Sequence, residues 1–198
     1  DEIIKKTFFG EINLWLQNGA SWTNEAWGEP PDAYFGEDFS ESHLKRLVGG
    51  ESADKAGHIF QKPGEDEDSE GINIRVDDYK GFTNVYYGHK DEKPTDILGG
   101  TFTVTKAQTG SGITLITDSK GLNVDSSKAA DKNLASETLN ALANKLFYTA
   151  YKNGETNLAG KVEIAEGLTS SSLSKRMEDI TFKESNGQGQ YLYTPASD

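Results

Sequence analysis

Cysteine is missing from this chain of 198 residues, and proline occurs only five times. The absence of cysteine excludes disulfide bonds and thiolate metal sites. The chain also lacks any run close to the roughly 18–20 apolar residues that a transmembrane helix needs. Its first residues, DEIIKKTFFG, have neither the basic region nor the long apolar core of a signal peptide. Because the chain opens abruptly on Asp1, we expect it to be cut from a longer protein.

Basic side chains are also in short supply. The chain has 20 lysines and arginines against 32 acidic residues, for a net charge of −12. A surface this acidic repels the phosphates of nucleic acids and the headgroups of anionic membranes. We therefore expect no nucleic-acid partner and no direct membrane insertion by this chain.

Apolar residues make up 34% of the chain and fall into short runs separated by turn residues such as Asn-Gly and Gly-Ser. Within most runs apolar and polar side chains alternate, which is the period of a strand with one buried face. The pattern predicts an all-β chain of many short strands. The residues expected to face the core are Ile12, Leu14, Leu16, Ile72, Ile74, Val76, Phe102, Val104, Ile113, Leu115, Leu122, Val124, Val162, Ile164, Ile180 and Phe182.

One segment, residues 131–154, has the period of a helix instead of a strand. Asp131 is suited to the N-cap and Gly154 to the C-terminal stop. The sequence therefore predicts an α-helix near residues 132–152, which packs an apolar stripe against the β core. The stripe residues recur at spacings of three and four: Leu139, Leu142, Leu146 and Ala150.

Several stretches, taken in order, resemble the passenger domains of bacterial autotransporters. They are INLWLQNGASWTN (12–24), LKRLVGGESADKAGHIFQK (44–62), INIRVDDYKGFTNVYYGHKD (72–91) and GSGITLITDSKGLNV (110–124). The third is similar to the strand–YxG–strand unit that precedes the terminal, folding-promoting part of such passengers. The segment after residue 130 resembles a helix-containing segment found within some of them.

This resemblance implies a right-handed parallel β-helix of the pertactin-like kind, a solenoid with the α-helix inserted into it or capping it. Residues 1–130 would form the coils, with long loops at residues 28–42, which hold the only Pro-Pro pair, and 62–71, a run of acids. Residues 131–198 would add the helix and further strands to the same solenoid. A translocator outside this chain would carry it to the surface of a Gram-negative cell or beyond.

Adhesion is the commonest use of passengers that lack a protease domain. The resemblance therefore implies a non-enzymatic stalk whose surface adheres to a host or bacterial surface protein, to a glycan, or to a second copy of the chain. Two alternatives stay open. A polysaccharide-processing hydrolase or lyase needs two carboxyl groups about 5–10 Å apart in a cleft. A structural module would instead promote the folding and secretion of its neighbours.

Side chains that could carry catalysis show no specific arrangement. The histidines His43, His58 and His89 are far apart in the chain, and they lack both a serine motif and a metal-ligand spacing. The adjacent acids Asp77–Asp78 and Glu178–Asp179 are expected by chance in so acidic a chain. We predict no catalytic residue and no cofactor.

The acidic stretch Asp66–Gly71 is the best metal candidate, because its D-x-D-x-E-G spacing could wrap oxygen ligands around Ca²⁺. No predicted helix enters it, and position twelve of such a loop is Asp77 instead of Glu. A solvated charged loop is the better interpretation, so no metal site is predicted.

Aromatic residues offer the best candidates for binding. In GFTNVYYGHK the alternation places Tyr86 and Tyr87 on opposite faces of one strand, so at least one tyrosine faces solvent. By the same alternation Trp15 lies on an outer face, whereas Trp22 points inward and Trp27 anchors the proline-containing loop. We predict Trp15 and Tyr86 as ligand-binding residues, because exposed aromatic rings beside amides suit sugar and protein ligands.

Overall fold

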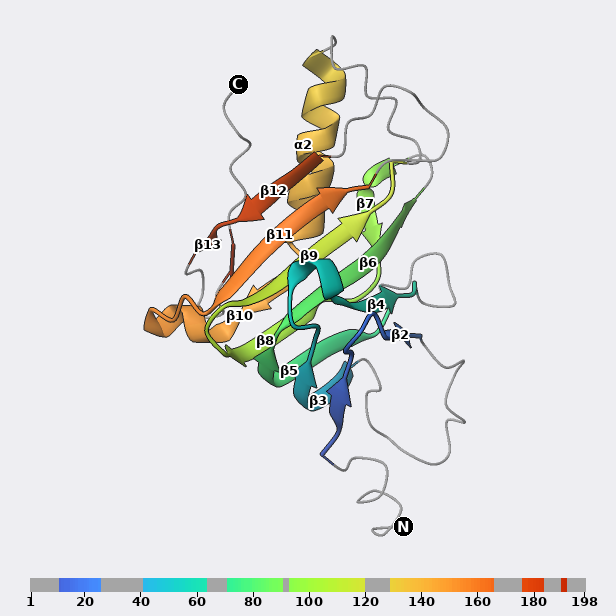
Figure 1. Ribbon diagram of the computed structural model, residues 1–198. Helices are drawn as coiled ribbons and strands as arrows, with labels where there is room; N and C mark the ends of the chain where they lie inside the picture. The colour runs from blue at the N-terminus through green and yellow to red at the C-terminus, as the bar shows by residue number, and fades with distance from the viewer. Residues whose placement is uncertain are drawn as a thin grey trace, which may run out of the picture.

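Two large β-sheets and one α-helix dominate the protein (Figure 1). The computed structural model describes residues 11–25, 41–63, 71–90, 93–119, 129–165, 176–183 and 190–191. The five-stranded sheet has the order β1 (Asn13–Trp15), β3 (Glu41–Val48), β5 (Asn73–Lys80), β8 (Phe102–Ala107) and β10 (Leu146–Tyr148). The seven-stranded sheet has the order β12 (Arg176–Ile180), β11 (Leu158–Ile164), β9 (Ser111–Thr117), β6 (Phe82–Lys90), β4 (Gly57–Gln61) and β2 (Ser21–Asn24), with β7 (Lys93–Leu98) paired to β6.

The remaining elements are short, apart from one helix. They are the 3₁₀ turns η1 (Ala53–Lys55) and η2 (Thr149–Asn153), the α-helix α2 (Ala129–Ala143), and a small sheet of β13 (Phe182–Lys183) and β14 (Gln190–Tyr191). Among the described helices, none is both long and apolar enough to span a lipid bilayer.

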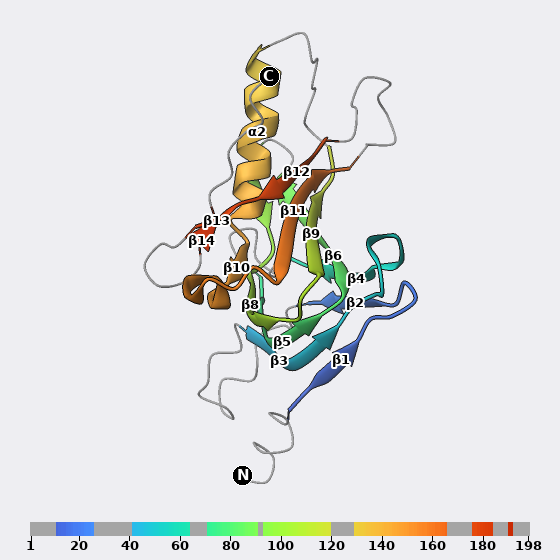
Figure 2. The ribbon, with the colours of Figure 1, turned by 60° about the vertical axis from the view of Figure 1, so that its left-hand side comes forward.

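Strands β1 to β6 and β8 to β11 alternate between the two large sheets, so hydrogen-bonded neighbours within these runs are not consecutive in the chain. β7 and β12 instead pair with the strands that directly precede them. β3 pairs with β1 and β5, for example, while β4 pairs with β2 and β6. All pairs of the five-stranded sheet are parallel, and so are the pairs from β2 to β11 in the other. β7 and β12 run antiparallel to β6 and β11. Figure 2 shows β8 and β10 on one side and β9 and β11 on the other.

The hydrophobic core includes the inward faces of both sheets. Val76 and Val104 face each other across β5 and β8, and Val85 and Leu115 do so across β6 and β9, all with no exposed surface. Such cross-strand pairs of branched side chains stabilise a sheet by packing on its pleated surface. Most of the predicted core positions in the described ranges are buried, but Ile12 precedes β1 and is 49% exposed.

A buried tyrosine links the two sheets. Tyr79 belongs to β5 of the five-stranded sheet; its hydroxyl donates to the carbonyl of Gly112 at 2.8 Å and shares a hydrogen bond of 2.9 Å with the Thr83 hydroxyl. Thr83 and Gly112 lie on β6 and β9 of the other sheet. The geometry satisfies a phenol that would otherwise be costly to bury.

The predicted right-handed parallel β-helix is wrong. The strands form two open sheets that do not close into a solenoid, and two of the strands, β7 and β12, run antiparallel to their partners. Short alternating runs with turn residues specify strands and their buried faces, but they do not specify how sheets end or whether they close. The part of the chain that the structure describes is mostly β, with two large mixed or parallel sheets and one α-helix.

The helix is shorter than predicted. It ends at Ala143, and the last part of the predicted segment forms strand β10 and the turn η2. Leu139 and Leu142 are fully buried, and the helix packs against β7, β9 and β11. Leu146 is also fully buried, but it lies on β10 opposite Phe102. The predicted stripe at helical spacing therefore contains core residues of two elements, the helix α2 and the strand β10 that follows it.

Candidate functional site

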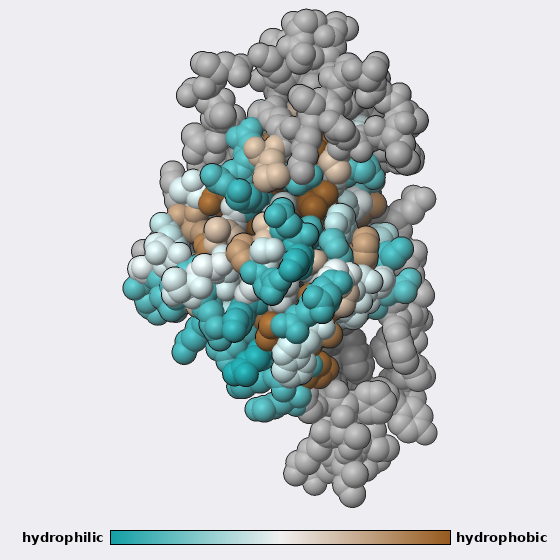
Figure 3. Space-filling view, viewed as in Figure 1, coloured by the Kyte–Doolittle hydropathy of each residue, from teal (hydrophilic) through white to brown (hydrophobic). Residues whose placement is uncertain are grey.

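The outer face of the seven-stranded sheet presents two parallel rows of side chains. Strand register sets one polar row: Ser21, His58, Asn84, Thr114, Lys161 and Asp179. It also sets a neighbouring row with more apolar character, of which Ile116 and Glu163 are buried: Thr23, Phe60, Tyr86, Ile116, Glu163 and Met177. In the space-filling view, hydrophobic residues form scattered patches among hydrophilic ones (Figure 3). We call these two rows the outer sheet face.

An aromatic pair forms the centre of the second row. The rings of Phe60 and Tyr86 stack with centroids 4.8 Å apart and an interplanar angle of 14°. Phe60 is 39% exposed, whereas Tyr86 is half-buried. The Tyr86 hydroxyl and His58 Nδ1 lie 3.0 Å apart and share a hydrogen bond, which joins the apolar row to the polar one. An exposed aromatic ring beside polar groups is an arrangement that protein surfaces use for binding.

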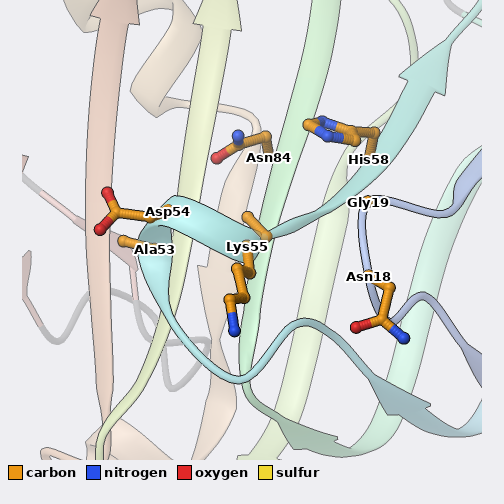
Figure 4. Close-up of a pocket in the computed structure, with 8 residues that line it drawn as sticks. Asn18, Gly19, Ala53, Asp54, Lys55, His58 and Asn84 are labelled. Atoms are coloured by element: carbon orange, nitrogen blue, oxygen red, sulfur yellow. The ribbon is translucent and has the colours of Figure 1, made fainter.

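A cleft of about 380 Å³ opens on the outer sheet face beside His58 and Asn84 (Figure 4). This size lies within the usual range of small-ligand sites. Four elements build the cleft: the turn between β1 and β2, the 3₁₀ turn η1, and the adjacent strands β4 and β6. Its lining combines polar and apolar surface in similar amounts and comprises Asn18, Gly19, Ala53, Asp54, Lys55, Ala56, His58 and Asn84.

Three polar groups of the cleft are free to bind a ligand. Within the described residues, the side-chain amides of Asn18 and Asn84 have no hydrogen-bond partner. His58 uses Nδ1 for Tyr86, and Nε2 likewise has no partner among the same residues. Asn84 is half-buried, which restricts its side chain to the surroundings of the cleft.

Two backbone features position the cleft. Asn18 and Gly19 have φ angles of 56° and 76°, the left-handed pair that a tight Asn-Gly turn requires. Gly57 lies directly before His58, where a Cβ would come within 2.4 Å of the carbonyl oxygen of Leu16. Only glycine allows β4 to begin this close to the end of β1. The Asn-Gly pair at residues 18–19 and the Gly-His pair at residues 57–58 therefore both help to shape the cleft.

The two predicted ligand-binding residues do not belong to one site. Tyr86 lies on the outer sheet face, and its neighbour Tyr87 is buried, with its hydroxyl donating to the carbonyl of Gly100 at 2.9 Å. Trp15 is 55% exposed, but it lies on β1 at the edge of the other sheet. The role of either residue in ligand binding stays a prediction. Trp22 is partly buried and packs against the core, and Trp27 lies outside the described residues.

The three histidines lie in three different environments. His58 lines the cleft, whereas His43 is exposed on β3, with Nε2 2.8 Å from Asp77 Oδ1. The His89 ring is almost completely buried near the end of β6, and its Nε2 lies 2.9 Å from Asp118 Oδ1. The part of the chain that the structure describes contains no group of three potential metal ligands. Of the acidic stretch Asp66–Gly71, only Gly71 lies within that part.

The two adjacent acid pairs of the sequence, Asp77–Asp78 and Glu178–Asp179, lie on different sheets. Asp77 belongs to β5 and is surrounded by cations: Lys45 Nζ is 3.7 Å from Oδ2, and Arg75 lies on the same strand. Partial burial alone would raise the pKa of Asp77, but the hydrogen bond from His43 and the charges of His43, Lys45 and Arg75 together lower it. Asp179 lies on β12 opposite Lys161, with the charged atoms 3.8 Å apart. Neither pair lines the cleft.

Four residues of the site were not predicted: Asn18, His58, Phe60 and Asn84. HIFQ (58–61) and NVYY (84–87) carry the same alternation, so each run alone indicates an outward polar and an outward aromatic position. Only the register between β4 and β6 sets His58 beside Asn84 and Phe60 beside Tyr86. That register depends on contacts between residues distant in sequence.

Comparison with known proteins identifies no relative. No family model, no curated protein and no solved structure matches this chain.

Proposed function

We propose that this chain is a non-enzymatic binding module, a piece of a bacterial passenger domain that is exposed at the cell surface or released from it. The outer sheet face is its adhesive surface. The observation that carries this proposal is the partly exposed Phe60–Tyr86 stack beside the cleft, because it joins an apolar contact area to hydrogen-bonding groups without partners among the described residues. The resemblance of the sequence to passenger domains supports the cell-surface setting.

The cleft favours binding over cleavage. A glycoside hydrolase needs two carboxyl groups that flank the scissile bond. Asp54 is the only carboxylate among the described residues that line the cleft. Among the described residues, the cleft therefore has the hydrogen-bonding groups of a binding site but not the pair of carboxyl groups that glycoside hydrolysis uses.

Adhesion of the purified full chain to cells tests this proposal. Fluorescently labelled chain is applied to epithelial cell layers and to Gram-negative cells, and the bound signal is measured by flow cytometry. A double variant with Phe60→Ser and Tyr86→Ser removes the exposed stack, and we expect at least a tenfold loss of bound chain, as for central contact residues of an interface. Ile12→Ser, which alters an exposed apolar residue outside the outer sheet face, is the matched control.

Equal binding by the double variant and the wild type would show that another surface adheres. Circular dichroism and urea unfolding must first show that the double variant is folded. Sedimentation of the wild type over a range of concentrations tests whether the partner is a second copy of the chain. Self-association that the double variant abolishes would place the same surface between copies.

A further inference from the structure

We propose that the cleft between the β1–β2 turn, η1 and strands β4 and β6 binds a neutral saccharide. The inference rests on the proposed function, because it assigns a ligand class to part of the same adhesive surface. Three properties of the cleft carry it: the kind of hydrogen-bonding groups, the local charge, and the aromatic side chains at its edge.

The hydrogen-bonding groups suit hydroxyls. A sugar hydroxyl donates one hydrogen bond and accepts others, and a carboxamide side chain offers both a donor and an acceptor. Asn18 and Asn84 bring two such amides to the cleft, and His58 brings Nε2. All three are without partners within the described residues, so a ligand hydroxyl would satisfy them without breaking an existing bond in the protein. A purely apolar ligand would leave them unpaired, which is costly.

The local charge favours a ligand without charge. Lys55 and Asp54 both line the cleft, and Lys55 Nζ is already paired with the carboxylate of Glu51. The cation is therefore neutralised, and the remaining carboxylate of Asp54 repels anions. The net charge of −12 adds a long-range field of the same sign. Uronic acids, sialic acids and phosphates are accordingly poor ligands for this cleft.

The aromatic pair supplies the apolar part of the contact. Sugar rings have C–H faces as well as hydroxyls, and a site for them combines apolar surface with convergent polar groups. His58 connects the two parts, because it lines the cleft and shares a hydrogen bond with Tyr86, whose ring stacks on that of Phe60. A saccharide chain that starts in the cleft can thus continue along strand β4 onto the exposed edge of Phe60.

Screening with neutral and acidic glycans tests the inference. The full chain is applied to a glycan array, and binding is then followed by NMR with neutral glucan, mannan and galactan oligosaccharides, with a polygalacturonate oligomer as the acidic comparison. We expect saturable shifts of the His58 and Asn84 resonances with at least one neutral oligosaccharide, and no such shifts with the acidic oligomer.

Two variants and one control assign the binding to the cleft. Asn84→Ala removes one amide, and Asn18→Gly removes the other while keeping a residue that adopts the left-handed backbone. Each should weaken binding at least fivefold, as expected for the loss of one hydrogen-bonding partner. Asn153→Ala, on the exposed turn η2, is the matched control and should change affinity less than twofold.

The inference is overturned if no neutral glycan binds, if the acidic oligomer binds as well as the neutral one, or if both amide variants bind like the wild type. The proposed function and the saccharide inference can be contradicted independently of each other. Adhesion to cells that depends on Phe60 and Tyr86, but that no saccharide competes, would mean that the module binds a protein. That result would support the adhesive surface and contradict the saccharide site.

Discussion

Asn24 and Gln61 lie opposite each other on β2 and β4, and the Asn24 side-chain amide donates a 2.8 Å hydrogen bond to Oε1 of Gln61. Both residues are buried. Asn24 also donates to the carbonyl of Ile72 and accepts from the hydroxyl of Ser42, while Gln61 donates to the carbonyl of Gly100. The two amides therefore tie loop backbone to the inner face of the seven-stranded sheet. A fully satisfied buried network of this kind specifies one arrangement of the strands.

Asn24→Ala should destabilise the protein by about 2–3 kcal/mol, because it leaves several buried polar partners unsatisfied. The free energy of unfolding in urea, measured through the shift of the midpoint, checks this value. Asn13→Ala, at an exposed position of β1, is the control, and it should stay within about 0.5 kcal/mol of the wild type. A midpoint for Asn24→Ala equal to that of the control would contradict the role of the amide network.

Tyr79 and Tyr87 should resist titration at alkaline pH. Burial raises the pKa of both phenols well above the usual value, although hydrogen bonds with Thr83 and Gln61 partly oppose the effect. A raised folded pKa gives stability that is fully present below the unfolded pKa of about 10 and is lost as pH rises toward the folded value. We expect the near-UV tyrosinate signal of these two residues to appear only with unfolding. In a Tyr79→Phe, Tyr87→Phe double variant, stability should fall less steeply above pH 10.

Acid should weaken the ion pairs around Asp77. Its pKa is lowered in the folded protein, so the stability that it contributes is present above the unfolded pKa near 4 and is lost as pH falls through the folded value. Asp77→Asn should therefore flatten the dependence of stability on pH in this acidic range. The effect is small and disappears at high salt, because the partners His43 and Lys45 are nearly half exposed. Urea unfolding at several pH values, at low and high ionic strength, measures it.

Leu142→Ala should be among the most destabilising single changes. Leu142 has no exposed surface and lies in helix α2, which packs against β7, β9 and β11. Truncation of a buried leucine costs about 2–5 kcal/mol through lost burial and the cavity left behind. Thermal unfolding followed by circular dichroism gives the change. Glu137→Ala, at an exposed position of the same helix, is the control; a similar loss in both variants would mean that the helix is not anchored through its apolar face.

Strand faces could be predicted from local pattern, because side-chain direction alternates within a strand whatever the strand pairs with. The alternation places Tyr86 and Tyr87 on opposite faces, and the structure shows Val85 and Tyr87 facing inward and Asn84 and Tyr86 outward. The misassignment of Leu146 has a physical cause as well. A leucine three or four residues after a helical stripe is equally suited to the core face of a short strand, and only its pairing with Phe102 decides between them.

Sheet arrangement and the cleft could not be predicted in this way. The cleft requires the turn at Asn18, the 3₁₀ turn at Asp54 and the strand residues His58 and Asn84 to meet, although up to 66 residues separate Asn18 from Asn84. The turn itself was recognisable from its Asn-Gly pair. Its neighbours in space depend on the strand register, which no short stretch of sequence contains.

The alternation of strands between two sheets also constrains how the chain folds. β5 must pair with β3, but β4 and the turn η1 lie between them in the sequence and belong to the other side of the core. Neither sheet can therefore be assembled alone from consecutive residues. The parallel pairings close long loops, from 26 positions between Gly57 and Thr83 to 47 between Ser111 and Leu158. Long-range pairings of this kind slow folding, since loop closure must precede the contacts that reward it. We expect a slow, stepwise folding reaction in which both sheets grow together, and a chain interrupted between β4 and β5 should leave both sheets incomplete.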